Sequence, residues 1–600
     1  MLALIKKTVS KPLTLTLLSF SLLSVNLPLF AATTTAPPAT TIEKPSTTHS
    51  QAAIYSQMEI HHPVWAKSGM VATQETIATQ IGLDILKQGG NAVDAAVAVG
   101  YALAVTLPRA GNLGGGGFML VYLADKKQVI AIDYREKAPA SASRDMYLDE
   151  HGEVVPDLSK FHGLAIGTPG TVMGLEHARK TYGTLSREQL MAPAIQLAKQ
   201  GIVVTADLAN SLNALKDRLS KWPNTRAIFY KADGSNYQPG DILKQEDLAN
   251  TLAIISKEGE KGFYQGDIAK AIANSIQQAN GVVTEKDLEN YNVVERKAIQ
   301  GTYRGYDVFS MPPPSSGGVH IVQILNMLEN YDLAAMGHNS AQHIHTLVES
   351  MRRAYADRSL HLGDSDFVKV PVKTLTSKKY AKQLVATINP DKATSSKDIQ
   401  PDANLPYESD QTTHFSVVDK WGNAATNTYT LNYSYGTGIV AKGTGVLLNN
   451  EMDDFSAKPG HANGYGLIGG EANAIAPGKR PLSSMSPTVI LKDKALFMVT
   501  GTPGGSRIIT TTLQVISNVI DYDMNIAEAT SATRIHHQWL PDYIRVESGL
   551  SADTTKLLES KGHQLKVQST MGSTQTIMKS DVGLYGASDP RTPSSLSAGY

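Results

Sequence analysis

The chain contains no cysteine among its 600 residues. Without a thiol it has no disulfide, no cysteine nucleophile, no iron–sulfur cluster and no cysteine-ligated zinc. It also lacks an excess of charge, because 55 basic residues balance 55 acidic ones. A neutral chain has no overall basic field to attract nucleic acid or an anionic membrane, so we expect small substrates instead.

Charge is sparse as well as balanced, since charged residues make up 18% of the sequence and hydrophobic residues 42%. This is enough apolar material for a large core and too little charge for a disordered chain. The length allows one large domain or several ordinary ones. We find no internal repeat, and no segment beyond the N-terminus reaches the ~20 apolar residues that span a bilayer.

The N-terminus has the pattern of a secretory signal in residues 1–31. Three early lysines form a basic start, an apolar stretch follows from Leu13, and small residues follow Pro28. An uncleaved membrane anchor is the alternative, but Asn26 and Pro28 interrupt the run well short of ~20 residues. We therefore expect export, with residues 32–60 as a flexible leader rich in Thr and Pro.

Hydrophobic patterning predicts a mixture of helices and strands in the remainder. Segment 91–106 is apolar nearly all round, which is typical of a buried helix in a layered protein. Segments 413–418 and 424–431 alternate around a Gly-containing turn and predict a hairpin. The mixture favours sheets covered by helices. Helices are further predicted at 74–87, at 506–520 and over most of 175–400, with strands at 118–123, 129–134, 445–448, 487–491 and 496–501.

Two kinds of motif carry no site. His343 and His345 lie two residues apart in a helical stretch and share no helix face, so we do not expect them to ligate one metal together. The adjacent pair His536 and His537 suits a packed or surface role. We therefore predict no metal. Residues 464–469 match the dinucleotide motif G-x-G-x-x-G by letters but lack the strand before and the helix after. Residues 114–117 lack the Lys-Ser/Thr of a phosphate-binding loop.

Thr412 is the candidate nucleophile. It lies at the start of the predicted hairpin, and no G-x-S-x-G serine motif is present. If the bond before Thr412 is cut, its new α-amino group, with a pKa of ~7.7–8.0, can serve as the general base for its own hydroxyl. Threonines that start strands are usually structural, so this spacing alone is a weak signal.

Three nearby motifs strengthen the prediction, although each also has an ordinary explanation. Gly504-Gly505 opens a helix, where free N–H groups can hold an oxyanion or simply form a turn. Ser483-Ser484 can bind a carboxylate or cap a loop. The acidic segment from Glu451 to Asp454 can hold a substrate ammonium or form a solvated turn.

Together these segments resemble the γ-glutamyltranspeptidase family (γ-glutamyltransferase, glutathione hydrolase) in its bacterial periplasmic form. The resemblance runs from about residue 72 to residue 600. Many ordered motifs carry it, at 114–118, 133–139, 412–414, 429–432, 448–455, 480–488 and 501–507.

The resemblance implies an α+β fold, the four-layer αββα sandwich of N-terminal-nucleophile hydrolases. It implies self-cleavage between Gln411 and Thr412 into a large subunit, 61–411, and a small catalytic subunit, 412–600, which remain together as a heterodimer. It further implies a periplasmic enzyme without a cofactor. Such an enzyme cleaves the γ-glutamyl amide of glutathione and passes the γ-glutamyl group to water, amino acids or dipeptides.

The resemblance also implies a role for each site residue. Thr412 forms the γ-glutamyl ester, and Thr430 orients Thr412. The N–H groups of Gly504 and Gly505 stabilise the oxyanion. The remaining residues bind the substrate: Arg135, Ser483 and Ser484 hold the α-carboxylate, Asn432, Glu451 and Asp454 hold the α-ammonium, Thr430 and Gly505 border the bound group, and Tyr465 closes a lid.

Two alternatives remain open at this point. A cephalosporin-type acylase of the same superfamily would keep the fold, but its glutaryl substrates lack the ammonium that Asp454 would serve. An exported binding protein without chemistry would not need a strand-starting threonine beside an oxyanion loop, and it would stay one chain.

Overall fold

The computed structural model describes residues 59–399, 412–461, 463 and 466–600. They belong to one compact unit, Met58–Tyr600. The predicted signal, nearly all of the predicted leader, Gln411 and Tyr465 lie outside the described residues. No helix in the described ranges is long and apolar enough to cross a membrane.

Two seven-stranded sheets form the centre of the unit. Sheet 1 has the order β1 (Val64–Ala66), β18 (Gly583–Ser588), β17 (Gln575–Ser580), β13 (Ala495–Thr500), β12 (Thr488–Lys492), β9 (Tyr306–Ser310) and β8 (Ile299–Tyr303). Sheet 2 has the order β19 (Leu596–Gly599), β2 (Met70–Thr73), β10 (Thr413–Val418), β11 (Ala424–Thr430), β3 (Gly116–Leu123), β4 (Gln128–Tyr134) and β7 (Val294–Lys297).

Alternation of side chains along β3 shows how the layers stack. Phe118 and Leu120 join the apolar cluster shared with residues of sheet 1, whereas Met119 and Val121 join the cluster shared with helices. Successive strand residues point to opposite faces, so a strand buried on both faces reads as a continuous apolar run. Sheet 2 therefore has sheet 1 on one face and helices on the other.

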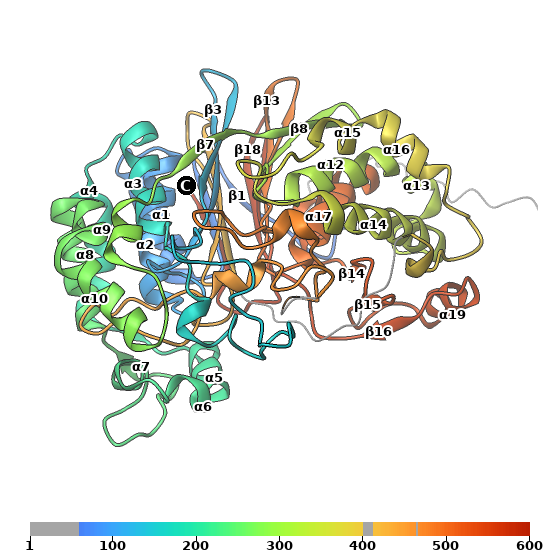
Figure 1. Cartoon of the computed structure of the whole chain (residues 1–600). Helices are drawn as coiled ribbons and strands as arrows, with labels where there is room; N and C mark the ends of the chain where they lie inside the picture. Colours follow the sequence, from blue (N-terminus) through green and yellow to red (C-terminus); the bar gives the residue numbers. More distant parts are fainter. Residues whose placement is uncertain (1–58, 400–411, 462, 464–465) are drawn as a thin grey trace, which may run out of the picture. The chain divides into compact units, whose positions relative to one another are not determined.

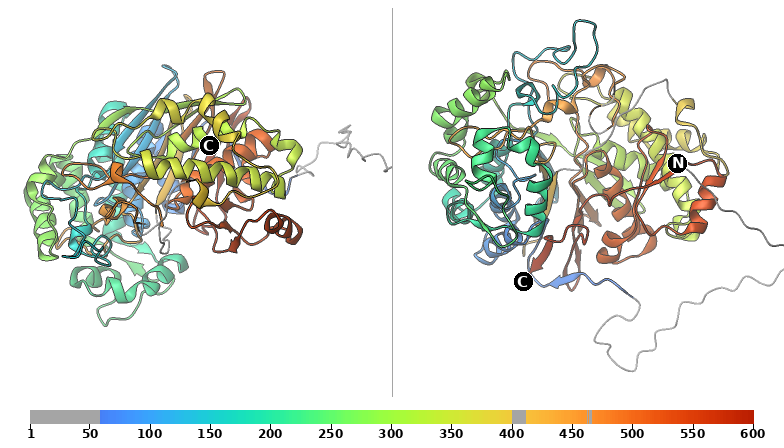
Figure 2. Two further views of the ribbon diagram at one scale, coloured as in Figure 1. Left: turned by 45° about the vertical axis from the view of Figure 1, so that its right-hand side comes forward. Right: turned by 90° about the horizontal axis from the view of Figure 1, so that it is seen from below.

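Helices cover the outer faces of the two sheets, and Figures 1 and 2 show the sheets between them. On sheet 2 these are α1 (Thr76–Lys87), α2 (Ala92–Thr106) and α3 (Thr171–Tyr182), with α4 (Arg187–Gln200), α5 (Ala206–Ala214), α6 (Lys216–Leu219), α7 (Pro223–Phe229), α8 (Glu246–Glu258), α9 (Lys261–Tyr264), α10 (Gly266–Gln278) and α11 (Glu285–Glu289) on the same side. On sheet 1 they are α12 (Gly317–Leu328), α17 (Arg507–Tyr522) and α18 (Ile526–Ser531), with α13 (Leu333–Met336), α14 (Ala341–His361), α15 (Val372–Leu375), α16 (Lys378–Val385) and α19 (Ala552–Ser560) nearby. The predicted αββα order is confirmed.

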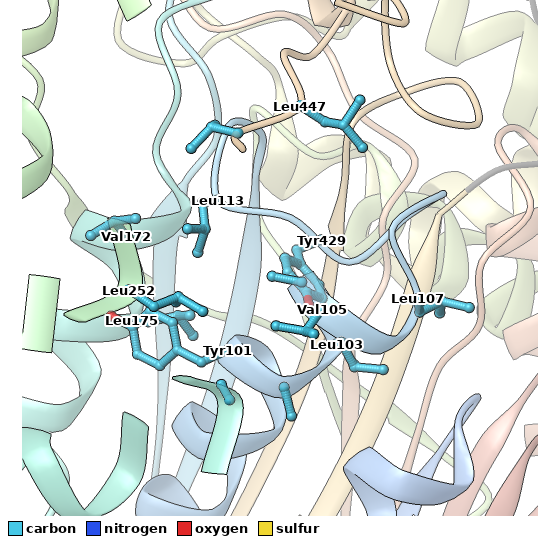
Figure 3. Close-up of a cluster of buried hydrophobic side chains, with 14 of the residues drawn as sticks. Tyr101, Leu103, Val105, Leu107, Leu113, Val172, Leu175, Leu252, Tyr429 and Leu447 are labelled. Carbon is cyan, nitrogen blue, oxygen red and sulfur yellow. The ribbon is translucent and has the colours of Figure 1, made fainter. Parts of the chain in front are cut away.

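Helix α2 is the buried helix that the sequence predicted. All of its residues are buried, and it packs between β10 and β11 on one side and α1, α3 and α4 on the others. Figure 3 shows its side chains Leu103 and Val105 near Tyr429 of β11, and Tyr101 beside Leu175 of α3. Asn91 caps the helix by accepting from the N–H of Asp94, whose carboxylate accepts from Asn91 N–H, so both ends of a capping box are present.

Strand β10 lies inside sheet 2 and pairs on both edges. Its antiparallel register with β11 sets Thr413 opposite Tyr429, and its register with β2 sets Phe415 opposite Thr73. The predicted hairpin is thus confirmed. Thr413 pairs with β11, and the pairing with β2 begins two residues later, so the start of the strand next to Thr412 is held in place.

Some predicted elements differ. Residues 294–310, predicted within a mostly helical region, form β7, β8 and β9. Strands β7 and β8 lie at sheet edges, where outward residues are polar. Polar residues on the outward side weaken the alternation of apolar residues from which a strand is predicted. Segment 445–448, predicted as a strand, makes only isolated bridges, such as Val440 to Leu447, because Gly445 has a left-handed φ of 68° that turns the chain. The C-terminal strands β14 (Ile535–His536) to β19 were not predicted; two of them are β15 (Ile544–Val546) and β16 (Leu565–Val567). A further pair, β5 (Ile202–Val203) and β6 (Ile242–Leu243), was also missed.

We predict that Leu103→Ala lowers the free energy of unfolding by about 2–5 kcal/mol, because the truncation leaves a cavity in a fully buried layer. Leu557→Ala on α19 is the matched control: that side chain is 56% exposed, and its loss is expected to stay within about 0.5 kcal/mol. Urea unfolding midpoints of the two variants and the parent measure the difference. Equal midpoints for both variants would contradict the packing role of α2.

Candidate active site

The structure brings most of the predicted site residues into one pocket at the ends of the two sheets. The predicted residues that line it are Arg135, Thr412, Thr430, Asn432, Glu451, Asp454, Ser483, Ser484 and Gly505. Gly504 is next to the pocket in sequence without lining it. Gln411 and Tyr465, predicted as the cleavage and lid residues, lie outside the described residues.

Thr412 and Thr430 meet because of the hairpin register. Extending the pairing of Thr413 with Tyr429 by one residue sets Thr412 against Thr430. The Thr412 hydroxyl donates to Thr430 Oγ1 at 3.3 Å, and Thr430 Oγ1 also accepts the backbone N–H of Asn432 at 2.9 Å. Asn432 has a left-handed φ of 76°, which turns the chain back over the end of β11. The candidate nucleophile is therefore fixed by backbone geometry.

Gly504 and Gly505 form the turn that leads into α17. Their φ values are 134° and 55°, conformations that residues with a Cβ rarely adopt. Neither backbone N–H donates to an acceptor within the described residues, whereas both carbonyls accept from the first turn of α17. Two unpaired N–H groups at a helix start are suited to hold a developing negative charge on oxygen.

Arg135 is the charged centre of the pocket. Its guanidinium is fully buried and pairs with Glu451 through Nη1 and with Asp454 through Nη2, while Nε donates to Pro481 O at 3.2 Å. The acidic segment is therefore buried in an ion-pair cluster, and a solvated turn is the wrong interpretation for it. Burial acts to lower the pKa of Arg135, but the carboxylates outweigh it and raise that pKa.

A third carboxylate, Glu136, lies behind this cluster and was not predicted. Its Oε2 is 3.6 Å from Arg135 Nη1, and neither of its oxygens forms a hydrogen bond within the described residues. Burial raises its pKa to about 7, against the opposing effect of Arg135. Burial likewise raises the pKa of Glu451 and of Asp454. The cluster is thus short of positive charge.

The two serines directly follow Leu482, whose carbonyl accepts from Arg135 Nη2 at 3.5 Å. Ser483 Oγ accepts the backbone N–H of Met485 at 3.1 Å, and Ser484 Oγ accepts from Arg358 Nη2 at 3.3 Å. Arg358 also lines the pocket. Sequence reasoning missed it because α14 carries three arginines among many polar residues, and nothing in the local pattern distinguishes Arg358 from the other two.

Histidines gather away from this pocket in a group that the sequence did not predict. His345 Nδ1 lies 2.8 Å from His563 Nε2, and Glu349 lies one turn further along α14. Metal-ligand atoms are close enough here for an ion. However, the Glu349 carboxylate already accepts from Arg352 and Arg353, and two guanidiniums beside it oppose a further cation. His536 and His537 are buried and hydrogen-bonded, as the packed alternative predicted.

Comparison with known proteins matches residues 78–599 to the family model described as gamma-glutamyltranspeptidase. The glutathione hydrolase proenzyme of Escherichia coli strain K12 is 56% identical over 544 residues, which cover 90% of this chain and 93% of that protein. The solved γ-glutamyltranspeptidase of Helicobacter pylori is 49% identical, with a TM-score of 0.53, over 54% of this chain and 93% of the solved one. A cephalosporin acylase from Bacillus halodurans is 27% identical, with a TM-score of 0.80, over 92% of this chain and 99% of the solved one.

We predict that Glu136→Gln changes how stability depends on pH. The folded protein keeps the Glu136 proton up to about pH 7, whereas an unfolded glutamate releases it near pH ~4.3. The folded state therefore binds more protons between these values, so the parent loses stability as pH rises toward 7. The glutamine variant lacks this loss. Melting temperatures of both proteins from pH 5 to 8 measure it, and parallel curves would contradict the buried-carboxyl assignment.

Proposed function

The chain belongs to the γ-glutamyltranspeptidase family, and we propose that it is an exported enzyme that processes itself and uses Thr412 as its nucleophile. It cleaves the γ-glutamyl amide bond of glutathione and related compounds and transfers the γ-glutamyl group to water or to an amino acid or peptide amine. The observation that carries the proposal is a single pocket that combines the threonine directly before β10, Gly505 of a turn whose glycine N–H groups have no acceptor within the described residues, and a buried Arg–carboxylate cluster. Export rests on the signal pattern of residues 1–31, and we place the enzyme in the periplasm.

Maturation is proposed to cut the chain between Gln411 and Thr412. Thr412 Oγ attacks the carbonyl of Gln411, the amide becomes an ester, and water releases the amine of Thr412. The large subunit, 61–411, and the small subunit, 412–600, then remain a heterodimer. Interleaved strands support this, because β10 and β11 lie between β2 and β3 in sheet 2, and β12 and β13 pair within the same sheet as β8 and β9.

Turnover uses the groups that maturation sets free. The α-amine of Thr412 accepts the hydroxyl proton while Oγ attacks the γ-carbonyl of the donor. Gly504 and Gly505 N–H groups hold the oxyanion, and one such donor is typically worth ~10²–10³ in rate. The tetrahedral intermediate collapses to a γ-glutamyl ester on Thr412, and the leaving amine takes the proton. Water or an acceptor amine then attacks the ester by the same steps in reverse, with Thr430 holding the nucleophile in place.

Substrate binding is proposed to proceed by exchange of ion pairs. In the structure Arg135 is occupied by Glu451 and Asp454. A γ-glutamyl donor brings one α-carboxylate and one α-ammonium. The donor's carboxylate pairs with Arg135 and displaces the protein's own carboxylates from it. Those displaced carboxylates then pair with the donor's ammonium. Ser483 and Ser484 donate to the carboxylate, and Asn432 accepts from the ammonium. Each charge of the donor then meets an opposite charge in the pocket, which limits the desolvation penalty.

Two further roles extend the proposal beyond the described residues and the pocket wall. Tyr465 closes over the bound γ-glutamyl group as part of a lid. Acceptor amino acids and dipeptides approach the ester from the open side of the pocket. A glutaryl donor fits less well, since it lacks the ammonium that Asp454 and Glu451 require.

We predict that Thr412→Ala remains a single chain and has no γ-glutamyltransferase activity, because both reactions need the hydroxyl. Thr412→Ser is the matched control: it keeps the hydroxyl and is expected to mature and turn over more slowly. Denaturing gels and release of a chromogenic amine from a γ-glutamyl anilide measure the two effects. Turnover by a correctly folded alanine variant would rule out Thr412 as the nucleophile.

We predict that Arg135→Lys still matures but raises KM for γ-glutamyl donors by ~10–100-fold, because an ammonium cannot reproduce the planar fork of a guanidinium. Steady-state kinetics with γ-glutamyl anilide and glutaryl anilide measure this, with the parent preferring the γ-glutamyl compound. An unchanged KM would refute the carboxylate clamp, and a parent that preferred the glutaryl compound would support an acylase instead.

A further inference from the structure

A second guanidinium in the pocket makes no direct ion pair with any carboxylate of the described residues. Arg358 projects from α14 and is only 4% exposed. Its Nε donates to Ser316 Oγ at 3.0 Å and its Nη2 to Ser484 Oγ at 3.3 Å. Within the described residues it forms no ion pair. Asp454 attracts it only at longer range, without a direct ion pair. Burying a charge without a direct ion pair is costly, so a fold that retains one at a pocket wall indicates that an anion binds there.

The direction of the hydrogen bond to Ser484 adds to this argument. A guanidinium has five N–H donors and no acceptor, so the Ser484 oxygen must accept. The hydroxyl hydrogen of Ser484 is then available to donate, and no other bond of this hydroxyl forms within the described residues. Because Ser484 and Arg358 both line the pocket, Arg358 presets Ser484 as a donor toward whatever anion lies there.

The carboxylates around Arg135 also favour a second cation in the pocket. Around Arg135 lie the carboxylates of Glu136, Glu451 and Asp454. One cation among three acidic groups attracts an ammonium but repels a second carboxylate. Arg358 supplies positive charge on the serine side. Burial lowers its pKa to about 10, mainly by desolvation, so it remains charged at neutral pH.

We propose that Arg358 is a positioning and selectivity residue that holds Ser484 as a donor and balances the charge of the donor substrate's α-carboxylate. Arg135 and Arg358 then have different roles. The Arg135 cluster orients the ammonium and one side of the carboxylate. Arg358 with Ser484 selects for the negative charge of that carboxylate. This inference rests on the proposed function, since it concerns how the same site recognises a γ-glutamyl group.

The test compares two donors that differ in one charge, a γ-glutamyl anilide and the same anilide with its α-carboxylate converted to a carboxamide. Arg358→Met removes the cation and keeps most of the side-chain volume. We expect kcat/KM for the carboxylate donor to fall by ~10–100-fold, mainly through KM, as is typical for loss of a charge-assisted contact. For the carboxamide donor we expect a change below ~3-fold, since it has no charge to lose.

Arg353→Met is the matched control on the same helix. Arg353 is also buried, but its guanidinium bonds Glu349 and Thr387 away from the pocket. It is expected to lower stability and to leave the ratio of the two donors unchanged. Ser484→Ala completes a double-mutant cycle: because Arg358 acts through Ser484, the double variant is expected to lose less selectivity than the two single losses combined.

Each outcome bears on the proposal. Equal losses on both donors, or an unchanged ratio, would overturn it and leave Arg358 with a structural role. If Arg358→Met stays a single chain, Arg358→Lys is tested in its place, since lysine keeps the charge but cannot hold both hydroxyls. Its ratio of kcat/KM for the carboxylate donor to kcat/KM for the carboxamide donor should fall several-fold. An unchanged ratio again overturns the proposal. A mature parent that turns over neither donor would instead reject the proposed function itself.

Discussion

The fixed position of strand β10 is the constraint on which the site depends. The strand pairs with β11 from Thr413 onward and with β2 from Phe415 onward, so it cannot shift along its axis without breaking two ladders. Thr412 precedes it directly, and the register delivers its hydroxyl to Thr430. A cut at that point frees an amine without freeing the strand. The same geometry can therefore serve first as a cleavage site and then as a catalytic centre, with no rearrangement of the sheet.

Charge in the pocket is carried by two guanidiniums in unlike surroundings. Arg135 is surrounded by carboxylates, whereas Arg358 donates to two hydroxyls and forms no direct ion pair within the described residues. A substrate with adjacent carboxylate and ammonium groups matches such a field, because each of its charges meets an opposite one. An uncharged or singly charged acyl group leaves part of the pocket unpaired, and unpaired buried charge is expensive. Selectivity thus follows from desolvation as much as from contact.

Local sequence predicted the parts of the fold whose signals are local. The hairpin around Gly422 and the all-apolar helix α2 have strong patterns, and both form as expected. Strands β7 and β8 were missed because edge strands expose polar side chains, which weakens the alternation that sequence reasoning uses. Most site residues came from the family resemblance, and the pocket assembles them. Glu136 and Arg358 were not identified, since what distinguishes them is the hydrogen-bond or ion-pair partner that the described residues do not provide, and this depends on the tertiary structure. His563 likewise contacts His345 only through the tertiary fold.

The measurement that tests this account most directly is intact mass analysis of the purified wild-type protein with N-terminal sequencing of each species. The account predicts two chains that co-purify, the smaller of which begins at Thr412 and ends at Tyr600. That result would establish the nucleophile and the self-processing class together. A single unprocessed chain with full γ-glutamyltransferase activity would contradict the account, because an acylated α-amine cannot accept the proton of the Thr412 hydroxyl.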